Sequence, residues 1–363
     1  MDFIDLKPQF QKHEAAIRER IDRVLAHGQF IMGPEVAELE SALAEYVGCR
    51  HAITVASGTD SLEIALRAFG IGAGDEVVTV PFTWISTAEV ILQVGAKPVF
   101  VDIDPLDYNI AVDRIESAIT PRTKAILPVS LFGQMPDYAA INAIAEKHDI
   151  PVIEDAAQSF GATRHGVKSC NATLVASTSF YPAKPLGCYG DGGALFTSDD
   201  DLAHRMRAIR NHGGIRRHYH DFVGMNGRFD TIQAAIMLAK WPGFPAEVES
   251  RARLGARYTA ALRDVCETPA IREGNTHVYA QYTIRVPNRD ALAEKLRSAG
   301  IPTAVYYPKC LHEQPVFAPL GHKAGDFPAA ESASREVLSL PLNPYLNESD
   351  QDRIISAVRS ALA

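Results

Sequence analysis

Cysteine is scarce in this chain of 363 residues, and its spacing excludes two ways of holding a fold together. The five cysteines are odd in number and scattered, and none forms a CxxC pair, so the sequence predicts neither a disulfide framework nor a cysteine zinc site. They are Cys49, Cys170, Cys188, Cys266 and Cys310. Such usage is typical of a reducing compartment, and we expect a cytoplasmic protein.

The sequence also lacks long hydrophobic runs and any concentration of positive charge. No stretch is long enough to cross a bilayer, and residues 1–7 do not start a cationic segment followed by an apolar one. The formal net charge is −8, without a basic stripe, although residues 216–220 make a small basic patch. We therefore expect a soluble protein that binds neither membrane nor nucleic acid.

Several common catalytic motifs are missing as well. No GxGxxG opens the first predicted strand–helix unit, which argues against a dinucleotide site. The glycine-rich loop at 179–193 has proline after its lysine, where a Walker phosphate loop requires Ser or Thr. The twelve histidines show no HExxH pattern, so no metal site is predicted.

Length and periodicity indicate an α/β protein with two structural domains. At 47% hydrophobic residues, the chain can bury one large core and one smaller core. Strand-like runs alternate with amphipathic helices over the first two thirds, which predicts a mostly parallel mixed sheet flanked by helices. The strand runs are 52–55, 76–80, 98–101, 125–129, 151–153, 176–179 and 194–197, and the clearest helices are 61–69, 137–148 and 200–211. We place a large domain at residues 1–245 and a smaller C-terminal α+β domain at residues 246–363.

The loop at 179–193 contains a lysine, Lys184, that is a candidate catalytic residue. Pro182 and Pro185 restrict the backbone on both sides of Lys184, and the glycines that follow permit unusual dihedral angles. A lysine held in this way can act as an amine nucleophile when burial lowers its pKa. A lone loop lysine is more often solvated, so its interpretation depends on the segments upstream.

Two upstream segments and one aromatic residue supply what pyridoxal phosphate needs around such an amine. A short apolar strand ends at Asp155, whose carboxylate can keep the ring nitrogen of the cofactor protonated. Gly58 and Thr59 lie in a strand-to-helix turn whose N–H groups, with the Ser179 hydroxyl, can bind the phosphate. Trp84 offers a flat apolar partner for the ring. Each signal alone also fits ordinary capping or core packing, but their joint occurrence in this order predicts a pyridoxal phosphate site.

Over nearly its whole length the chain resembles the sugar aminotransferases of the DegT/DnrJ/EryC1/StrS type, which are fold-type I pyridoxal phosphate enzymes acting on nucleotide-linked keto sugars. The matching segments are 30–36, 57–59, 81–84, 154–159, 179–184 and 224–230. One departure is Trp84, because the family often has phenylalanine or tyrosine there, an exchange that stacking tolerates. The resemblance implies a fold-type I large domain with a smaller C-terminal domain.

The resemblance also implies roles for individual residues. Lys184 would be the Schiff-base lysine, and Asp155 would pair with the pyridinium nitrogen. Gln158 would lie near the 3-hydroxyl of the cofactor, and Ser179 would contact its phosphate. Asn226 would reach the phosphate bound by the neighbouring subunit.

Three further residues are expected to contact the substrate. Arg228 offers a guanidinium for a carboxylate or pyrophosphate, although without the resemblance it fits a surface ion pair equally well. Tyr307 and His312 belong to a segment, 306–312, that is similar to a family segment near the substrate. By the resemblance Asn226 and Arg228 cross a subunit boundary, so we expect a two-fold homodimer with shared active sites.

The resemblance finally implies the reaction. Glutamate is expected to give its amino group in the first half of a ping-pong cycle, and a keto sugar to receive it in the second. Similarity is greatest to family members that aminate C3 of a UDP-linked 2-acetamido-2-deoxy-3-oxo-glucuronate for bacterial O-antigen, a part of lipopolysaccharide. The alternatives are a dTDP-linked 3-keto or 4-keto deoxyhexose and, more distantly, a non-catalytic pyridoxal phosphate-binding sensor. Dehydratase relatives carry histidine at the lysine position, so Lys184 argues against that branch.

Overall fold

The computed structural model describes residues 1–216 and 218–363. The basic patch expected at 216–220 includes residue 217, which lies outside the described residues. No helix in the two described ranges combines the length and the apolar composition that a bilayer crossing requires.

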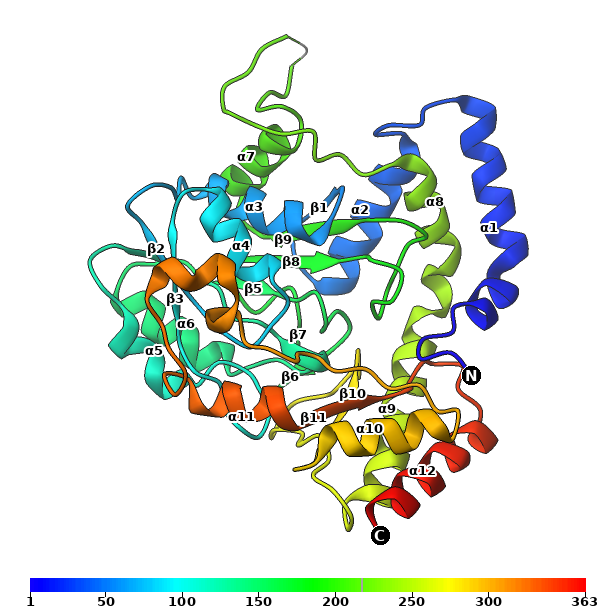
Figure 1. Ribbon diagram of the computed structural model, residues 1–363. Coiled ribbons are helices and arrows are strands. Elements are labelled where there is room, and N and C mark those ends of the chain that lie inside the picture. The colour runs from blue at the N-terminus through cyan, green and yellow to red at the C-terminus, as the bar shows by residue number, and fades with distance from the viewer. Residues whose placement is uncertain (217) are drawn as a thin grey trace.

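The centre of the molecule is a mixed sheet in the order β1-β9-β8-β5-β4-β2-β3 (Figure 1). Its four-stranded and three-stranded parts are joined by parallel bridges from Ile126 to Val152 and from Val129 to Asp155. Strand β9 runs antiparallel to both of its neighbours, β1 and β8, while the other pairs are parallel. The strands are β1 (His51–Val55), β2 (Glu76–Thr79), β3 (Lys97–Phe100), β4 (Thr123–Ile126), β5 (Ile153–Asp155), β8 (Val175–Ser179) and β9 (Gly193–Thr197). The mostly parallel mixed sheet predicted from the sequence is confirmed.

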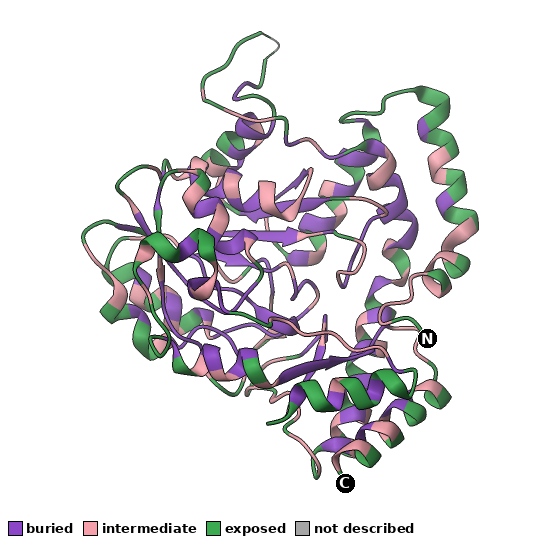
Figure 2. Ribbon diagram, in the orientation of Figure 1, coloured by how far each residue is buried: buried purple, intermediate pink, exposed green. Residues whose placement is uncertain are grey.

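These strands form because helices cover both faces of the sheet. Every residue of β2, β5 and β9 is buried, which is the pattern of a sheet with no wet face (Figure 2). One face packs on α3, α4 and α7, and the other on α2 and α8 at one end and on α5 and α6 at the other. The helices are α1 (Lys7–His27), α2 (Pro34–Val47), α3 (Gly58–Ala68), α4 (Ser86–Gln93), α5 (Val112–Ala118), α6 (Tyr138–Lys147), α7 (Asp200–Arg210) and α8 (Thr231–Lys240).

The C-terminal part builds a second core around a two-stranded antiparallel pair, β10 and β11. It contains α9 (Phe244–Leu262), β10 (Tyr282–Arg285), α10 (Arg289–Ser298), α11 (Pro328–Glu336), β11 (Val337–Leu340) and α12 (Glu348–Leu362). Helix α9 runs without a break across the expected boundary at 245–246, and Leu311 and Phe317 pack into the core of the first part. The division into residues 1–245 and 246–363 stays a prediction.

The remaining elements are short connections. They are a hairpin of β6 (Thr163–Arg164) and β7 (Val167–Lys168), and the 3-10 turns η1 (Leu131–Gly133), η2 (Trp241–Gly243), η3 (Leu311–Glu313) and η4 (Pro315–Leu320). The turn η3 returns the chain to the large sheet, because the N–H of Leu311 donates to the carbonyl of Pro81 at 2.7 Å. In this way a C-terminal segment reaches the loop that follows β2.

Candidate active site

A cavity of about 460 Å³ opens where several parallel strands end. Loops after β1, β2, β5 and β8 form most of its wall, as expected for a ligand site at the carboxyl ends of strands. The lining residues include Ser57, Gly58, Thr59, Trp84, Ser86, Asp155, Gln158, Ser179, Tyr181, Lys184, Gln281, Tyr306 and Tyr307. Eight of the residues predicted from the sequence therefore meet in one place: Gly58, Thr59, Trp84, Asp155, Gln158, Ser179, Lys184 and Tyr307.

Lys184 is presented by a tight turn. Its backbone N–H donates to the carbonyl of Tyr181 at 2.9 Å, and Gly187 closes the turn. A Cβ at Gly187 would lie only 2.6 Å from the carbonyl oxygen of Pro182, so glycine is required there. Burial lowers the pKa of Lys184, and the nearby Asp155 opposes part of that change. The surroundings therefore make deprotonation of the amine easier than in an exposed lysine, and the neutral form is the nucleophile.

Asp155 ends β5 and points its carboxylate into the cavity. The Thr87 hydroxyl donates to Oδ2 at 2.8 Å, and the N–H of Ala157 donates to Oδ1 at 3.1 Å. Burial raises the pKa of Asp155, while Thr87, Ala157 and Lys184 each act to lower it. The carboxylate is therefore held by two donors in a site where it can stabilise a cation.

Glu154, the neighbouring acid, serves a different purpose. Alternate residues of a strand face opposite sides of the sheet, and Glu154 is fully buried on the other side. Its carboxylate accepts hydrogen bonds from the Ser130 and Ser169 hydroxyls, both at 2.8 Å, and from the N–H of Cys170 at 2.9 Å. Burial raises the pKa of Glu154. It does not line the cavity, so Asp155 is the carboxylate available there.

The first turn of α3 forms an anion cradle beside these groups. Ser57 caps the helix by accepting a hydrogen bond from the N–H of Asp60 at 3.0 Å. A Cβ at Gly58 would lie 2.8 Å from the Cβ of Ser179, so glycine lets the helix end approach Ser179 closely. The hydroxyl of Thr59 is 2.8 Å from that of Ser86. A helix N-terminus ringed by hydroxyls suits a phosphate group.

Gln158 and two aromatic residues complete the wall. The N–H of Phe132 donates to Oε1 of Gln158 at 2.8 Å, which orients the amide so that Nε2 donates to the Tyr307 hydroxyl at 3.1 Å. The ring centroids of Tyr307 and Trp84 are 6.3 Å apart. Trp84 is 58% exposed and lines the cavity, so its ring is accessible to a ligand bound there.

Together these side chains fit pyridoxal phosphate. The amine of Lys184, the carboxylate of Asp155 and the cradle at Gly58 match the three chemically distinct parts of that cofactor, which are an aldehyde, a basic ring nitrogen and a phosphate. Trp84 adds a face for the ring. Among the described residues, no group of three or more His, Cys, Asp or Glu side chains is arranged to hold a metal ion.

Three of the predicted site residues lie outside this cavity: Asn226, Arg228 and His312. Asn226 and Arg228 follow α7 in an extended segment that bridges to Asn211 and to Val55, and Arg228 donates to Oδ1 of Asn211 at 3.1 Å. They do not line the cavity of their own chain.

His312 is the third predicted residue that does not line the cavity. Its side chain is completely enclosed, with Nε2 3.2 Å from Oε1 of Glu331. Glu331 is nineteen residues further along the chain, in α11. Its contact with the sugar stays a prediction, and the Glu331 contact gives His312 a structural role in this chain.

Sequence reasoning missed several residues that the fold brings to the site. Thr87 is the donor to Asp155, and Gln281 comes from the C-terminal part of the chain. Oε1 of Gln281 is buried with no hydrogen-bond partner among the described residues. For Thr87 a signal existed, because it follows the segment 81–84 by one helical turn. The sequence contained no comparable signal for Gln281, because the other residues that line the cavity are far from it in sequence.

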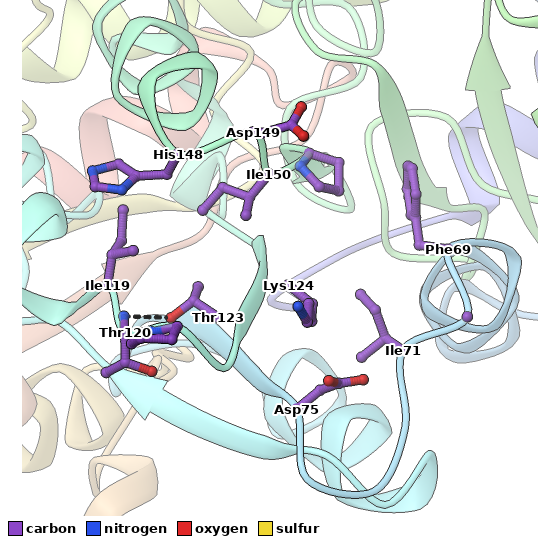
Figure 3. A pocket seen from close by; sticks show the side chains of 13 residues that line it. Phe69, Ile71, Asp75, Ile119, Thr120, Thr123, Lys124, His148, Asp149 and Ile150 are labelled. Carbon is purple, nitrogen blue, oxygen red and sulfur yellow. Dashed lines mark hydrogen bonds between the residues drawn. The ribbon is translucent and has the colours of Figure 1, made fainter.

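A larger cavity, of about 810 Å³, lies at the opposite edge of the sheet (Figure 3). It is lined by residues at the amino ends of β2, β4 and β5, including Asp75, Thr123 and Pro151, together with Lys124 and His148. None of the predicted site residues lines it. Because functional groups of open parallel sheets gather at the carboxyl ends of strands, the smaller cavity is the candidate active site.

The sequence profile of the DegT/DnrJ/EryC1/StrS aminotransferase family matches residues 11–359. The chain belongs to this aminotransferase family. Over 359 residues the aminotransferase is 52% identical to the UDP-2-acetamido-2-deoxy-3-oxo-D-glucuronate aminotransferase of Pseudomonas aeruginosa, which covers 99% of each chain. It is 46% identical to the pleiotropic regulatory protein of Geobacillus stearothermophilus, over 98% of this chain and 96% of the relative.

Solved structures agree with this assignment. The aminotransferase matches a DegT DnrJ EryC1 StrS aminotransferase from Brucella abortus with a TM-score of 0.97 and 46% identity, over 100% of both chains. It matches Ntda from Bacillus subtilis, solved with bound cofactor PMP (pyridoxamine phosphate), with a TM-score of 0.90 and 32% identity, over 97% of this chain and 82% of that one. The protein is therefore a fold-type I aminotransferase that depends on pyridoxal phosphate.

Proposed function

We propose that this aminotransferase moves the amino group of glutamate to C3 of a UDP-linked 2-acetamido-2-deoxy-3-oxo-glucuronate, in the synthesis of a bacterial cell-surface polysaccharide such as O-antigen. The observation that carries the proposal is the meeting of Lys184, Asp155 and the α3 cradle in one cavity. The choice of sugar is supported by the 52% identical relative that acts on it.

Each wall residue has a task in this function. Pyridoxal phosphate, when bound, withdraws electrons from the reacting carbon and carries the amino group between the two substrates. Lys184 holds the cofactor through its amine, and Asp155 keeps the ring nitrogen protonated. Gly58, Thr59 and Ser179 bind the phosphate. Gln158 lies by the 3-hydroxyl, and Trp84 stacks on the ring.

Lys184 also moves the proton. With pyridoxal phosphate bound and the amine of Lys184 free, that amine would carry a proton from the Cα of glutamate to the cofactor. Its lowered pKa leaves a larger fraction of that amine neutral near physiological pH. The keto sugar would use the same cavity after 2-oxoglutarate has left, and Lys184 would then carry the proton in the opposite direction, from the cofactor to the sugar carbon. Two substrates that share one cavity in turn give ping-pong kinetics.

Substrate recognition is assigned to Tyr307, Gln281 and Arg228. Tyr307 and Gln281 line the cavity, so the hydroxyl of Tyr307 and the amide of Gln281 can form hydrogen bonds with a bound sugar. Arg228 lies outside its own cavity, and we assign it, with Asn226, to the site of a partner subunit in a homodimer. Its guanidinium would bind the uronic carboxylate, which would be costly to bury without a cation.

Two other functions are weighed against this one. A dTDP-linked 3-keto or 4-keto deoxyhexose is the alternative substrate, and it lacks the carboxylate that Arg228 is proposed to bind. A non-catalytic sensor is the more distant alternative, suggested by the name of the regulatory relative. The complete set of Lys184, Asp155 and phosphate-binding groups favours catalysis. A turnover assay with glutamate separates the two.

The substrate is tested with a panel of keto sugar nucleotides and glutamate as donor. We expect the highest kcat/KM for the UDP-linked 3-oxo-uronate, and Arg228→Lys should lose at least tenfold of that preference over a neutral 3-keto sugar, because ammonium cannot form a bidentate pair with a carboxylate. Arg257→Lys is the matched control, since Arg257 pairs with Asp352 on the small part of the molecule. A wild-type preference for the neutral sugar would contradict the proposed substrate.

The shared site has its own test. Mixing Lys184→Ala protein with an Asn226→Ala, Arg228→Ala double variant should restore activity in heterodimers, because each mixed dimer regains one intact site. Subunit exchange is verified by mass spectrometry of differently tagged chains. If exchanged dimers stay inactive, these residues act within their own chain.

A further inference from the structure

A buried cation lies directly behind the turn that carries Lys184. Lys240 ends α8 and is only 2% exposed, and its ammonium donates a hydrogen bond to the carbonyl oxygen of Gly187. It also donates to Oε1 of Gln9, in α1, at 3.2 Å, and the ring centroid of Tyr189 lies 4.8 Å from Nζ. Lys240 does not line the cavity. It therefore contacts the turn through the Gly187 carbonyl without forming part of the cavity wall.

The charge of Lys240 is balanced by Glu247 through Gln9. The amide Nε2 of Gln9 donates to both carboxylate oxygens of Glu247, at 3.0 and 2.8 Å. Glu247 also accepts from the Tyr345 hydroxyl, and the ring of His13 lies 3.8 Å away. The Gln9 amide thus stands between the two buried charges, and buried charges add little stability over apolar residues of the same size. The hydrogen bonds from Glu247 through Gln9 to Lys240 nevertheless connect α9, α1 and α8 to the Gly187 carbonyl of the turn.

That peptide group is closely coupled to Lys184. A Cβ at Gly187 would lie 2.7 Å from the carbonyl oxygen of Tyr181, and the same carbonyl accepts the hydrogen bond from the N–H of Lys184 at 2.9 Å. The N–H of Cys188, the residue after Gly187, donates to the carbonyl oxygen of Phe180 at 2.7 Å. Displacement of Gly187 would therefore displace the carbonyl that fixes Lys184.

We propose that Lys240 is a positioning residue for Lys184. Gln9 and Glu247 orient the ammonium of Lys240, and that ammonium fixes the Gly187 peptide. The fixed peptide in turn keeps the amine of Lys184 directed into the cavity. The inference rests on the proposed role of Lys184 as the amine that holds the cofactor. The position and surroundings of that amine can nevertheless be measured in cofactor-free protein.

The experiment compares Lys240→Met, which keeps the apolar stem but removes the donors, with Lys168→Met as a matched control. Lys168 likewise donates to a backbone carbonyl and lies over an aromatic ring, both of Tyr46, but it does not contact the turn. Two readouts are taken without cofactor. One is hydrogen exchange of the amides of Lys184 and Cys188. The other is acetylation of Lys184 against pH, with the exposed Lys295 as reference.

In Lys240→Met we expect at least tenfold faster exchange in the turn. The midpoint of the Lys184 acetylation profile should move to higher pH, toward that of Lys295, because a loosened amine regains water. Lys168→Met should leave both within twofold of wild type, and Lys240→Arg should restore part of the effect. Should Lys240→Met not fold, Gln9→Leu weakens the same link from α1 and is read in the same way.

Two results separate the possible failures. A Lys240→Met protein that is less stable in urea but keeps normal exchange and acetylation in the turn would make Lys240 purely structural and overturn the inference. If borohydride reduction of the loaded protein labelled a lysine other than Lys184, the proposed function would fail at its first step. The cofactor-free readouts would still report how Lys240 holds the turn.

Discussion

Replacement of Thr87 by valine tests whether the charge on Asp155 depends on a single hydroxyl. Valine keeps the shape of threonine but removes the donor that lies 2.8 Å from Oδ2 of Asp155. A hydrogen bond to a charged group contributes about 1.5–3 kcal/mol. If that energy is lost where the carboxylate supports the transition state, kcat/KM should fall by roughly tenfold to a hundredfold.

The pH dependence of Thr87→Val follows with a definite sign. The hydroxyl favours the charged carboxylate and lowers the pKa of Asp155 against the effect of burial. Its removal should raise that pKa further, so less of the protein carries the carboxylate at a given acidic pH. The acidic limb of the kcat/KM profile should therefore move to higher pH.

The matched control is Thr79→Val. Thr79 is equally buried, and its hydroxyl donates to the carbonyl of Leu127 at 2.8 Å, within the same sheet but away from Asp155. Thr79→Val removes a hydrogen bond to a neutral carbonyl, so it should cost about 0.5–1.5 kcal/mol of stability in urea but keep kcat/KM within about twofold of wild type. If Thr87→Val also keeps its rate and its acidic limb, the reasoning about Asp155 is refuted.

Four other substitutions give separate outcomes. Lys184→Ala should abolish turnover, and borohydride reduction of wild type should attach the cofactor to the peptide containing Lys184, as peptide mass spectrometry would reveal. Asp155→Ala should fold normally by circular dichroism but lose orders of magnitude in kcat, and a near-normal rate would move the carboxylate role elsewhere. Gln281→Leu should slow the half-reaction with the sugar but not the half-reaction with glutamate, measured by single-turnover absorbance; equal effects on both would argue against a sugar contact. His312→Gln should lower the midpoint of urea unfolding without changing sugar preference, because its partner is the buried Glu331.

Much of the fold could be read from local patterns. The apolar runs near 52–55, 176–179 and 194–197 coincide with β1, β8 and β9 within one residue, because a sheet covered on both faces demands continuous apolar segments. The same pattern hides strand direction, so the antiparallel course of β9 could not be predicted. Helix α1 was not predicted either. It buries only Ile17 and Val24, too few for a clear apolar stripe.

Some of the candidate site residues could likewise be predicted from local sequence, and others could not. Lys184 and Asp155 could be predicted as the reacting groups from local features, because Lys184 lies between prolines and Asp155 ends an apolar strand. It could not place His312, whose surroundings come from α11, or tell that Asn226 and Arg228 lie outside the cavity of their own chain.

The contacts that orient the proposed reacting groups depend on the tertiary structure. Thr87 reaches Asp155 from α4, Gln281 enters the cavity from beyond α9, and Lys240 supports the Lys184 turn from α8. The physical reason is that a hydrogen bond depends on distance and direction between groups that are far apart in sequence. Residue type and spacing can identify a reactive amine, but only the packed sheet and helices select the donors that orient it.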